Sequence, residues 1–408
     1  MSLAASSALV DWAPAIEVGL VGAAVAVLPV LWVALRLRRQ GQVGALAWQR
    51  ALTLATLFLT IDLVVFGAFT RLTDSGLGCP DWPGCYGSAS PVGAHADIAE
   101  AQAIAPTGPV THGKAWIEMI HRYLATGVGA LIVLLMSLAW WRHLKAKDTV
   151  TPPAYQAQAS PLSPWWPTWT FIWVCAQGAF GAFTVTLKLY PMVVTGHLLG
   201  GLIGVVLLTA QARAMALPVG HAAEAQALPV VLRRAAWWVL GVWFVQAALG
   251  AWVSTNGAVL ACASFPLCQG QWWPAMNWAQ GFTLWRGLGH DGQGGFITLP
   301  ALTAIHMGHR LGAVVATAAV LWLAARLWPV ARREAWGLLA LLLLQILSGL
   351  SNVVLGWPLL AALGHTLGAA LMAGWLTRMA VAAPVVLSVS SGSVQSPCPP
   401  PWFPLKRT

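Results

Sequence analysis

Four histidines occupy matching places in the apolar stretches of this sequence. Each stands in a short repeated segment, "IHRYLATG", "GHLLGG", "GHRLGA" or "GHTLGA", and these segments hold His121, His197, His309 and His365. Two imidazoles on facing helices of a bundle can supply both axial ligands of one haem. A single histidine of this kind is more often a polar contact between helices, but four at equivalent places favour cofactor binding. Zinc and copper fit less well, because each pair lacks the carboxylate or thiolate partners that these ions usually have.

A single carboxylate distinguishes the first histidine from its counterpart in the second half of the chain. Glu118 stands three residues before His121, so both side chains share one face of a helix. At the same distance before His309 the chain has His306 instead. A charge near the centre of a membrane costs about 2.5–3.5 kcal/mol, so it usually marks a partner or a reaction. The asymmetry predicts that one haem is chemically altered, with Glu118 as an acid, base or charge-stabilising group, and that the other haem assists.

Two cysteine pairs have the same spacing. Cys79 and Cys85 lie six residues apart in "CPDWPGC", and Cys262 and Cys268 lie six apart in "CASFPLC". Four cysteines allow three pairings, of which the within-loop pairs Cys79–Cys85 and Cys262–Cys268 are the simplest. Both loops are expected outside the cytoplasm, where thiols oxidise. A structural disulfide and a redox-active pair near the site both remain open.

The elements that must position these residues are membrane helices. The chain of 408 residues is 58% hydrophobic and only 8% charged, against about 25% charged in soluble domains. Its 25 tryptophans fit the aromatic belts at membrane interfaces. Apolar segments of spanning length stand at residues 16–35, 50–69, 116–140, 165–187, 192–212, 235–254, 301–325, 335–354 and 358–381. The sequence therefore predicts an all-α integral membrane protein.

The positive charges indicate how these helices are oriented. Sixteen of the 22 Lys and Arg residues fall on one side of the predicted spans, and the opposite loops hold only Arg71, Lys114, Lys188 and Arg286. By the positive-inside rule, the N-terminus is predicted to be periplasmic and the C-terminus cytoplasmic. The net charge of +10 is thus a topology signal, and no nucleic-acid partner is expected.

One helical-hairpin motif occurs four times in the sequence. Its outgoing helices end in "FGAFTR", "FGAFTV", "LGAWVS" and "SGLSNV", and each returning helix carries one of the four histidines. Gly181 and His197 are 16 residues apart, as are Gly349 and His365, whereas the other two hairpins have long outer loops. We expect two tandem four-helix bundles related by a pseudo-twofold axis along the membrane normal, plus one extra N-terminal transmembrane helix.

This repeat divides the chain into five parts. The first apolar segment is followed by "LRLRRQ" and has no basic stretch before it, which favours a retained helix over a cleaved signal peptide. The C-terminal segment is rich in Ser and Pro, which predicts disorder. The expected parts are an extra helix with a basic loop at 1–49, a first half at 50–212, a linker at 213–234, a second half at 235–381 and a disordered cytoplasmic tail at 382–408.

Three further polar residues fall within the predicted helices. Arg122 and Arg310 each follow a repeated histidine, and we expect them to pair with haem propionates or with other helices. Asp62 has no counterpart in the other hairpins. A hydrogen bond between helices is expected there in preference to a catalytic role.

Taken together, these motifs resemble a known family. The stretch "FGAFTRLTDSGLGCPDWPGC", the "EMIHR" helix, the second cysteine loop, "HMGHR" and "GHTLG" resemble the haem A synthases of the COX15/CtaA family over about residues 50–381. The resemblance implies eight helices in two similar halves and a bound haem b. It implies oxidation of a ring methyl of haem O to a formyl group, giving haem A for cytochrome oxidase assembly. The implied setting is the bacterial inner membrane and its lipid, with haem O synthase and an electron acceptor as partners, and a homo-oligomer is compatible with it.

The resemblance also implies a role for each candidate residue. His121 and His197 match the ligands of the substrate haem iron, and Glu118 matches an acidic residue required at the active site. His309 and His365 match the ligands of the haem b iron, and the two cysteine pairs match the outer-loop cysteines of the family. The segment at 16–35 departs from the eight-helix pattern. His306, one turn from His309, is an additional candidate ligand in the second half.

Two other classes of protein compete with this interpretation. A dihaem membrane cytochrome that transfers electrons without altering its haems would also place two histidines in each bundle. Glu118 in one half only, and the long cysteine-bearing loops over both sites, favour the enzyme. A haem or ion transporter would fit the repeats, but not the matched histidines on the outer side alone.

Overall fold

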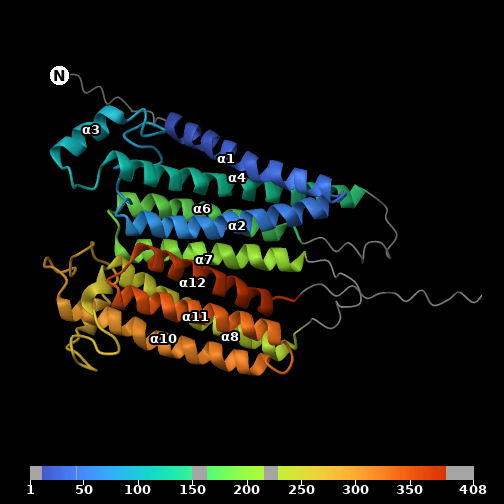
Figure 1. The fold of residues 1–408 in the computed structure, drawn as a ribbon. Coiled ribbons are helices and arrows are strands. Elements are labelled where there is room, and N and C mark those ends of the chain that lie inside the picture. Colours follow the sequence, from blue (N-terminus) through green and yellow to red (C-terminus); the bar gives the residue numbers. More distant parts are fainter. Residues whose placement is uncertain (1–11, 43, 149–162, 216–227, 383–408) are drawn as a thin grey trace, which may run out of the picture.

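The computed structural model describes residues 12–42, 44–148, 163–215 and 228–382, and within these ranges every long element is a helix (Figure 1). The long helices are α1 (Ala13–Arg39), α2 (Ala45–Leu72), α4 (His112–Asp148), α6 (Trp165–Thr186), α7 (Pro191–Ala214), α8 (Val230–Thr255), α10 (Leu299–Leu327), α11 (Arg332–Val354) and α12 (Leu359–Ala380). Short helices lie in two loops: α3 (His95–Ile104), η3 (Ala258–Ala261) and α9 (Trp278–Gly281). The all-α prediction is confirmed, and each predicted apolar segment lies within or along one long helix.

Eight helices in the described part of the chain are long and apolar enough to cross a membrane. The exception among the long helices is α6, which has 22 residues and no charged side chain. Its Trp, Thr and Gln residues lower its hydropathy below that of the other eight. The protein is therefore a multi-pass membrane protein. Most helices extend beyond the predicted segments, because a helix can continue through the polar interface after its apolar window ends.

The helices pack in two groups of four. In one group α2 contacts α4 and α7, and α6 contacts the same two helices. In the other, α8 contacts α10 and α12, and α11 contacts the same two. The groups meet where α2 and α7 pack against α12, and where α7 packs against α8. The division into halves at 50–212 and 235–381 and the pseudo-twofold axis between them remain predictions.

The two long loops gather at one end of the bundle, which we call the loop end. Figure 1 shows α3, from the first loop, and the loop that contains α9 at the same end, on the left of the view. The first of these loops spans residues 73–111 and the second spans 256–298. The predicted tail, the N-terminal residues 1–11 and the middle of the predicted linker (216–227) lie outside the described residues. The periplasmic position of the loop end stays a prediction.

The extra helix α1 packs along the first group of helices, against α4 and α2. Gly22 of α1 faces Thr126 of α4, and Val25 faces Gly127, so small residues allow the two helices to approach closely. At the loop end, Val18 of α1 joins a buried cluster that contains the first cysteine pair. This helix therefore covers one side of the first half and supports its loop.

Glutamine side chains connect the two helices in three of the four hairpins. Gln177, Gln246 and Gln345 stand four residues before the repeated glycines, and each side chain lies where a Cβ of a facing glycine would be. Those facing glycines stand three residues after the repeated histidines, at Gly200, Gly312 and Gly368. Gln345 Nε2 also donates to the backbone oxygen of His365 at 2.7 Å. Thus these glycines serve helix packing.

This packing predicts different effects for two neighbouring glycines of α12. Gly368→Ala would force the buried Gln345 side chain to move, and overpacking of this kind costs about 1–3 kcal/mol. Gly364, one turn earlier, has no atom within 4 Å of an added Cβ. Gly364→Ala should therefore keep or slightly raise stability, because alanine is the better helix former by roughly 0.5–1 kcal/mol. Thermal unfolding in detergent measures both variants, and a Gly368→Ala protein as stable as Gly364→Ala would contradict the packing role.

Candidate functional site

Each repeated histidine packs against the repeated glycine of the preceding helix. The distances from an added glycine Cβ to the imidazole Cε1 are 3.1 Å for Gly67 and His121, 3.6 Å for Gly181 and His197, 2.8 Å for Gly250 and His309, and 3.1 Å for Gly349 and His365. A side chain at these glycines would crowd or displace the ring. The sequence repeat thus corresponds to one repeated contact, which sets the depth and direction of all four imidazoles.

The helices that carry the histidines lie across each bundle from one another. Among the described residues α4 and α7 make no backbone contact, and neither do α10 and α12. In each group the two remaining helices separate them. The imidazoles therefore approach each other across the centre of a bundle, which is the arrangement that a haem held between two helices needs.

The pair in the second half has the geometry of two axial ligands. The ring centroids of His309 and His365 are 6.4 Å apart, and the ring planes are nearly perpendicular, at 83°. With metal–nitrogen bonds of about 2 Å, this separation leaves room for one metal ion between the rings. A second ligand type is not at hand, since no group of three or more His, Cys, Asp or Glu side chains gathers into a metal site within the described ranges. The pair fits a haem iron.

The pair in the first half occupies the same repeated positions but has apolar surroundings. His121 packs against Gly67 and His197 against Gly181. Phe66 stacks on His121, with ring centroids 6.2 Å apart and planes 10° from parallel. The Nδ1 atoms of both histidines are buried without a hydrogen-bond partner in the described structure. Axial ligation of a haem by these two residues stays a prediction.

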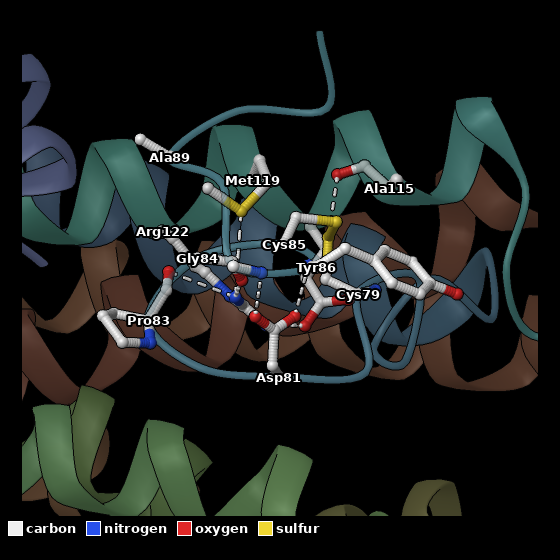
Figure 2. Close-up of a disulfide and its surroundings, with 12 residues drawn as sticks. Cys79, Asp81, Pro83, Gly84, Cys85, Tyr86, Ala89, Ala115, Met119 and Arg122 are labelled. Carbon is white, nitrogen blue, oxygen red and sulfur yellow. Dashed lines mark hydrogen bonds and ion pairs between the residues drawn. A yellow bond between two sulfur atoms is a disulfide. The ribbon is translucent and has the colours of Figure 1, made fainter. Parts of the chain in front are cut away.

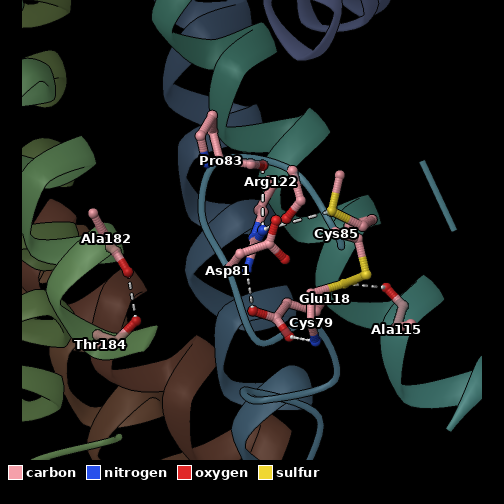
Figure 3. A network of polar contacts seen from close by, with 12 residues as sticks. Cys79, Asp81, Pro83, Cys85, Ala115, Glu118, Arg122, Ala182 and Thr184 are labelled. Carbon is pink, nitrogen blue, oxygen red and sulfur yellow. Dashed lines mark hydrogen bonds and ion pairs between the residues drawn. A yellow bond between two sulfur atoms is a disulfide. The ribbon is translucent and has the colours of Figure 1, made fainter. Parts of the chain in front are cut away.

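Glu118 is held by two contacts at the loop end of α4 (Figure 3). Its Oε2 accepts a hydrogen bond of 2.8 Å from the backbone N–H of Cys79, and its Oε1 pairs with Arg122 at 2.5 Å. The carboxyl group is 4% exposed. A buried ion pair of this kind is costly to break from one side, by about 3–5 kcal/mol. Glu118 therefore joins the ligand helix to the first cysteine loop.

The arginines that directly follow His121 and His309 each hold a cysteine loop in place. Arg122 donates to the backbone oxygens of Pro83, at 3.2 Å, and of Gly84 (Figure 2). Arg310 donates to the corresponding oxygens of the second loop, those of Pro266 at 3.3 Å and Leu267 at 3.2 Å. Pairing with haem propionates was one of the two expectations for these residues. Both arginines contact the loops, and pairing with haem propionates stays a prediction.

Both cysteine pairs form within-loop disulfides. Cys79 is bonded to Cys85 and Cys262 to Cys268, as predicted. After each disulfide the chain makes the same tight turn, in which Cys85 exchanges two backbone hydrogen bonds with Ser88, and Cys268 with Gln271. The loops are thus structural repeats, like the helices that they connect.

The second loop has its own buried cation. Arg286 is 2% exposed and donates to Asn256 Oδ1 at 2.5 Å and to the backbone oxygen of His290 at 2.8 Å. Burial lowers the pKa of Arg286, and the charge of Asp291 opposes that change. The guanidinium of Arg286 donates its hydrogen bonds to neutral oxygens and not to a carboxylate. The position of Arg286 in an outer loop was predicted, but its burial was not.

His306 takes the place of Glu118 in the second half but makes a different contact. Its Nδ1 lies 3.0 Å from the backbone oxygen of Ala258, in η3. His309, in contrast, faces Gly250 and His365. The geometry therefore favours His309 as the ligand, with His306 supporting the loop.

Asp62 differs from its expectation. No hydrogen-bond partner for Asp62 is found among the described residues, and its side chain is exposed on α2 beside a small cavity between α1, α2 and α4. The predicted hydrogen bond between helices is therefore not found. The remaining lining of this cavity is apolar.

Comparison with known proteins identifies the family of the chain. A family model described as "COX15-CtaA: Cytochrome oxidase assembly protein" matches residues 50–377. The chain belongs to the COX15/CtaA family. A "Heme A synthase" of Shewanella oneidensis is 37% identical over 322 residues, which cover 78% of this chain and 91% of the relative. Proteins of the same name from Sphingopyxis alaskensis and Erythrobacter litoralis are 31% and 28% identical, covering 81% and 77% of this chain and 90% of each relative.

The structure of this COX15/CtaA chain adds residues that the sequence did not single out. Ser348 is 8% exposed and lies 3.0 Å, through its hydroxyl oxygen, from Nδ1 of His365. The residue directly precedes the repeated Gly349, so the repeat places it beside a ligand. In the sequence, Ser348 is distinguished by being a serine within a mainly apolar segment.

Proposed function

We propose that the protein is a haem A synthase, an oxidoreductase that converts a ring methyl of haem O to the formyl group of haem A for cytochrome oxidase assembly. The single observation that carries the proposal is the pairing of two similar histidine sites with one carboxylate, Glu118, in the first half only. Membership of the COX15/CtaA family and the names of its relatives support the same reaction.

The first half is the proposed substrate site. His121 and His197 would bind the iron of haem O, and the apolar residues around them, such as Phe66, suit a flat macrocycle. Oxidation of a methyl group removes electrons and protons and develops positive charge at the carbon. Glu118, fixed one turn from His121, can stabilise that charge or accept a proton.

The second half is the proposed site of haem b. His309 and His365 would hold it, and when bound it supplies a one-electron redox centre beside the substrate half. His309 and His365 orient it, and the second disulfide loop, fastened by Arg310, covers the loop end of that bundle. The electron acceptor and haem O synthase are proposed partners, and a homo-oligomer remains compatible.

The proposed setting is the bacterial inner membrane, with the N-terminus and the loop end in the periplasm and the C-terminus in the cytoplasm. The distribution of Lys and Arg supports this orientation. An electron-transfer cytochrome would have the same paired histidines, but it would have no use for a carboxylate in only one half.

Removing single histidines should separate the two sites. His309→Ala and His365→Ala should lose haem b, because one axial ligand remains in a site that holds its haem through two. His121→Ala and His197→Ala should keep haem b while losing haem A formation. Haem extraction with chromatography and pyridine haemochrome spectra of the purified variants measures both quantities.

His306→Ala serves as the matched control, since His306 is one turn from His309 and contacts the loop. It should retain haem b. Equal loss of haem b from the variants of His121, His197, His309 and His365 would overturn the division of labour.

Neutralising the carboxylate tests its chemical role. Glu118→Gln keeps the shape of the side chain and can still accept from Cys79, but it removes the charge. Haem A formation should fall at least about tenfold, equivalent to about 1.4 kcal/mol of barrier, with haem b content preserved and haem O or a half-oxidised haem accumulating. Product haems in cells that supply haem O give the measurement.

Arg122→Gln is the control for loop anchoring, because it breaks the same ion pair from the other side. An equal fall in haem A formation for both variants would assign Glu118 to the loop contact alone, as would normal output from Glu118→Gln.

A further inference from the structure

The four histidines differ at Nδ1, the nitrogen that would face away from a haem iron held through Nε2. Ser348 Oγ lies 3.0 Å from Nδ1 of His365, and the serine hydroxyl donates its own proton to the backbone oxygen of Leu344 at 2.7 Å. The serine oxygen is therefore free to accept a proton from Nδ1. This contact selects the imidazole tautomer whose Nε2 lone pair is available to a metal.

The other histidine of the second half has a donor at this nitrogen. Gln246 Nε2 lies 3.0 Å from Nδ1 of His309 and also donates to the backbone oxygen of His309 at 3.2 Å. In the first half, Nδ1 of His121 and Nδ1 of His197 are buried without a partner within the described ranges. Among the described residues, His365 is thus the one of the four histidines whose Nδ1 faces a hydroxyl acceptor.

This difference arises at one position of the repeated hairpin, directly before the glycine that contacts the histidine. Ser348 directly precedes Gly349, which contacts His365. The residue in the same place before Gly181, which contacts His197, is Phe180. A phenylalanine offers no acceptor, so His197 lacks what His365 has. One position thus distinguishes equivalent hairpins of the two halves.

Support at Nδ1 changes how firmly a histidine binds a metal. An acceptor fixes the ring orientation and makes the imidazole a stronger donor, and losing such a partner typically costs about 10–100-fold in affinity. A prosthetic haem must stay bound, whereas a substrate must enter and leave as product. The acceptor behind His365, and the lack of a partner behind His197 in the described structure, match these two requirements at equivalent hairpins.

We propose that Ser348 is a positioning residue that makes the second-half site retain its haem, and that Phe180 at the equivalent place leaves His197 a weaker ligand so that the first-half haem can exchange. This inference rests on the proposed function, because it takes the first-half haem to be a substrate. It assigns the difference between a resident and an exchanging haem to one residue in each half.

The first arm of the test removes and restores the hydroxyl in the full-length protein. Ser348→Ala should release haem b to apomyoglobin at least about tenfold faster than the unaltered protein. It should also raise the haem b midpoint potential, because a less electron-donating imidazole stabilises ferric iron less. Ser348→Thr keeps a hydroxyl and should stay close to the unaltered protein in both measurements. Unchanged release and potential in Ser348→Ala would overturn the proposal.

The second arm transfers the serine to the first half. Phe180→Ser should slow release of haem O and haem A several-fold, while Phe180→Ala, which opens the same space without an acceptor, should not. Equal behaviour of the two variants would overturn the proposal for that half. The first arm reads dissociation and potential only, so its failure is distinct from a failure of the proposed function, which would appear as no haem A formation by the unaltered protein.

Discussion

The close contact between a helix glycine and the edge of an imidazole organises this molecule. It occurs four times, and an added Cβ would lie only 2.8–3.6 Å from the ring carbon in each case. The contact holds each of the four histidines at the depth of its counterpart across the bundle, as the proposed ligation of one haem iron by two histidines requires. The contact also requires adjacent helices to lie close together. In three hairpins a glutamine side chain packs against a glycine of the facing helix and fills the space between the two helices. Ligand geometry and helix packing are therefore set by the same residues.

The loops above the two sites depend on those ligand helices in turn. Arg122 and Arg310 each follow a ligand directly and donate to corresponding backbone oxygens of a disulfide loop. The position of each loop is thereby fixed relative to the histidine below it. The halves then differ at a few places: Glu118 against His306 at the loop end, and Phe180 against Ser348 directly before the glycine that contacts a histidine. These substitutions within a common frame are how one bundle could come to bind a substrate and the other a prosthetic group.

Much of this arrangement could be predicted from the sequence. Apolar runs of spanning length predicted the helices, and the repeated glycines, histidines and cysteines predicted the paired sites and the disulfides that the structure contains. The loop contacts of Arg122 and Arg310 could not be predicted, because hydrogen bonds from long side chains depend on loop paths that carry no periodic signal. The exposure of Asp62 depends on how α1, α2 and α4 pack, which the repeat does not indicate. The contact between Ser348 and His365 could not be predicted either, because it depends on the distance between two side chains on neighbouring helices.

The most direct test of two unlike haem sites is the haem content of the unaltered protein. The protein should be purified from cells that make haem O, and its extracted haems should be separated by chromatography and related to protein concentration. We predict a constant amount of haem b together with a variable amount of haem O, its partly oxidised forms and haem A. Haem b alone, in an amount sufficient to fill both sites, would contradict it and indicate a dihaem electron-transfer protein.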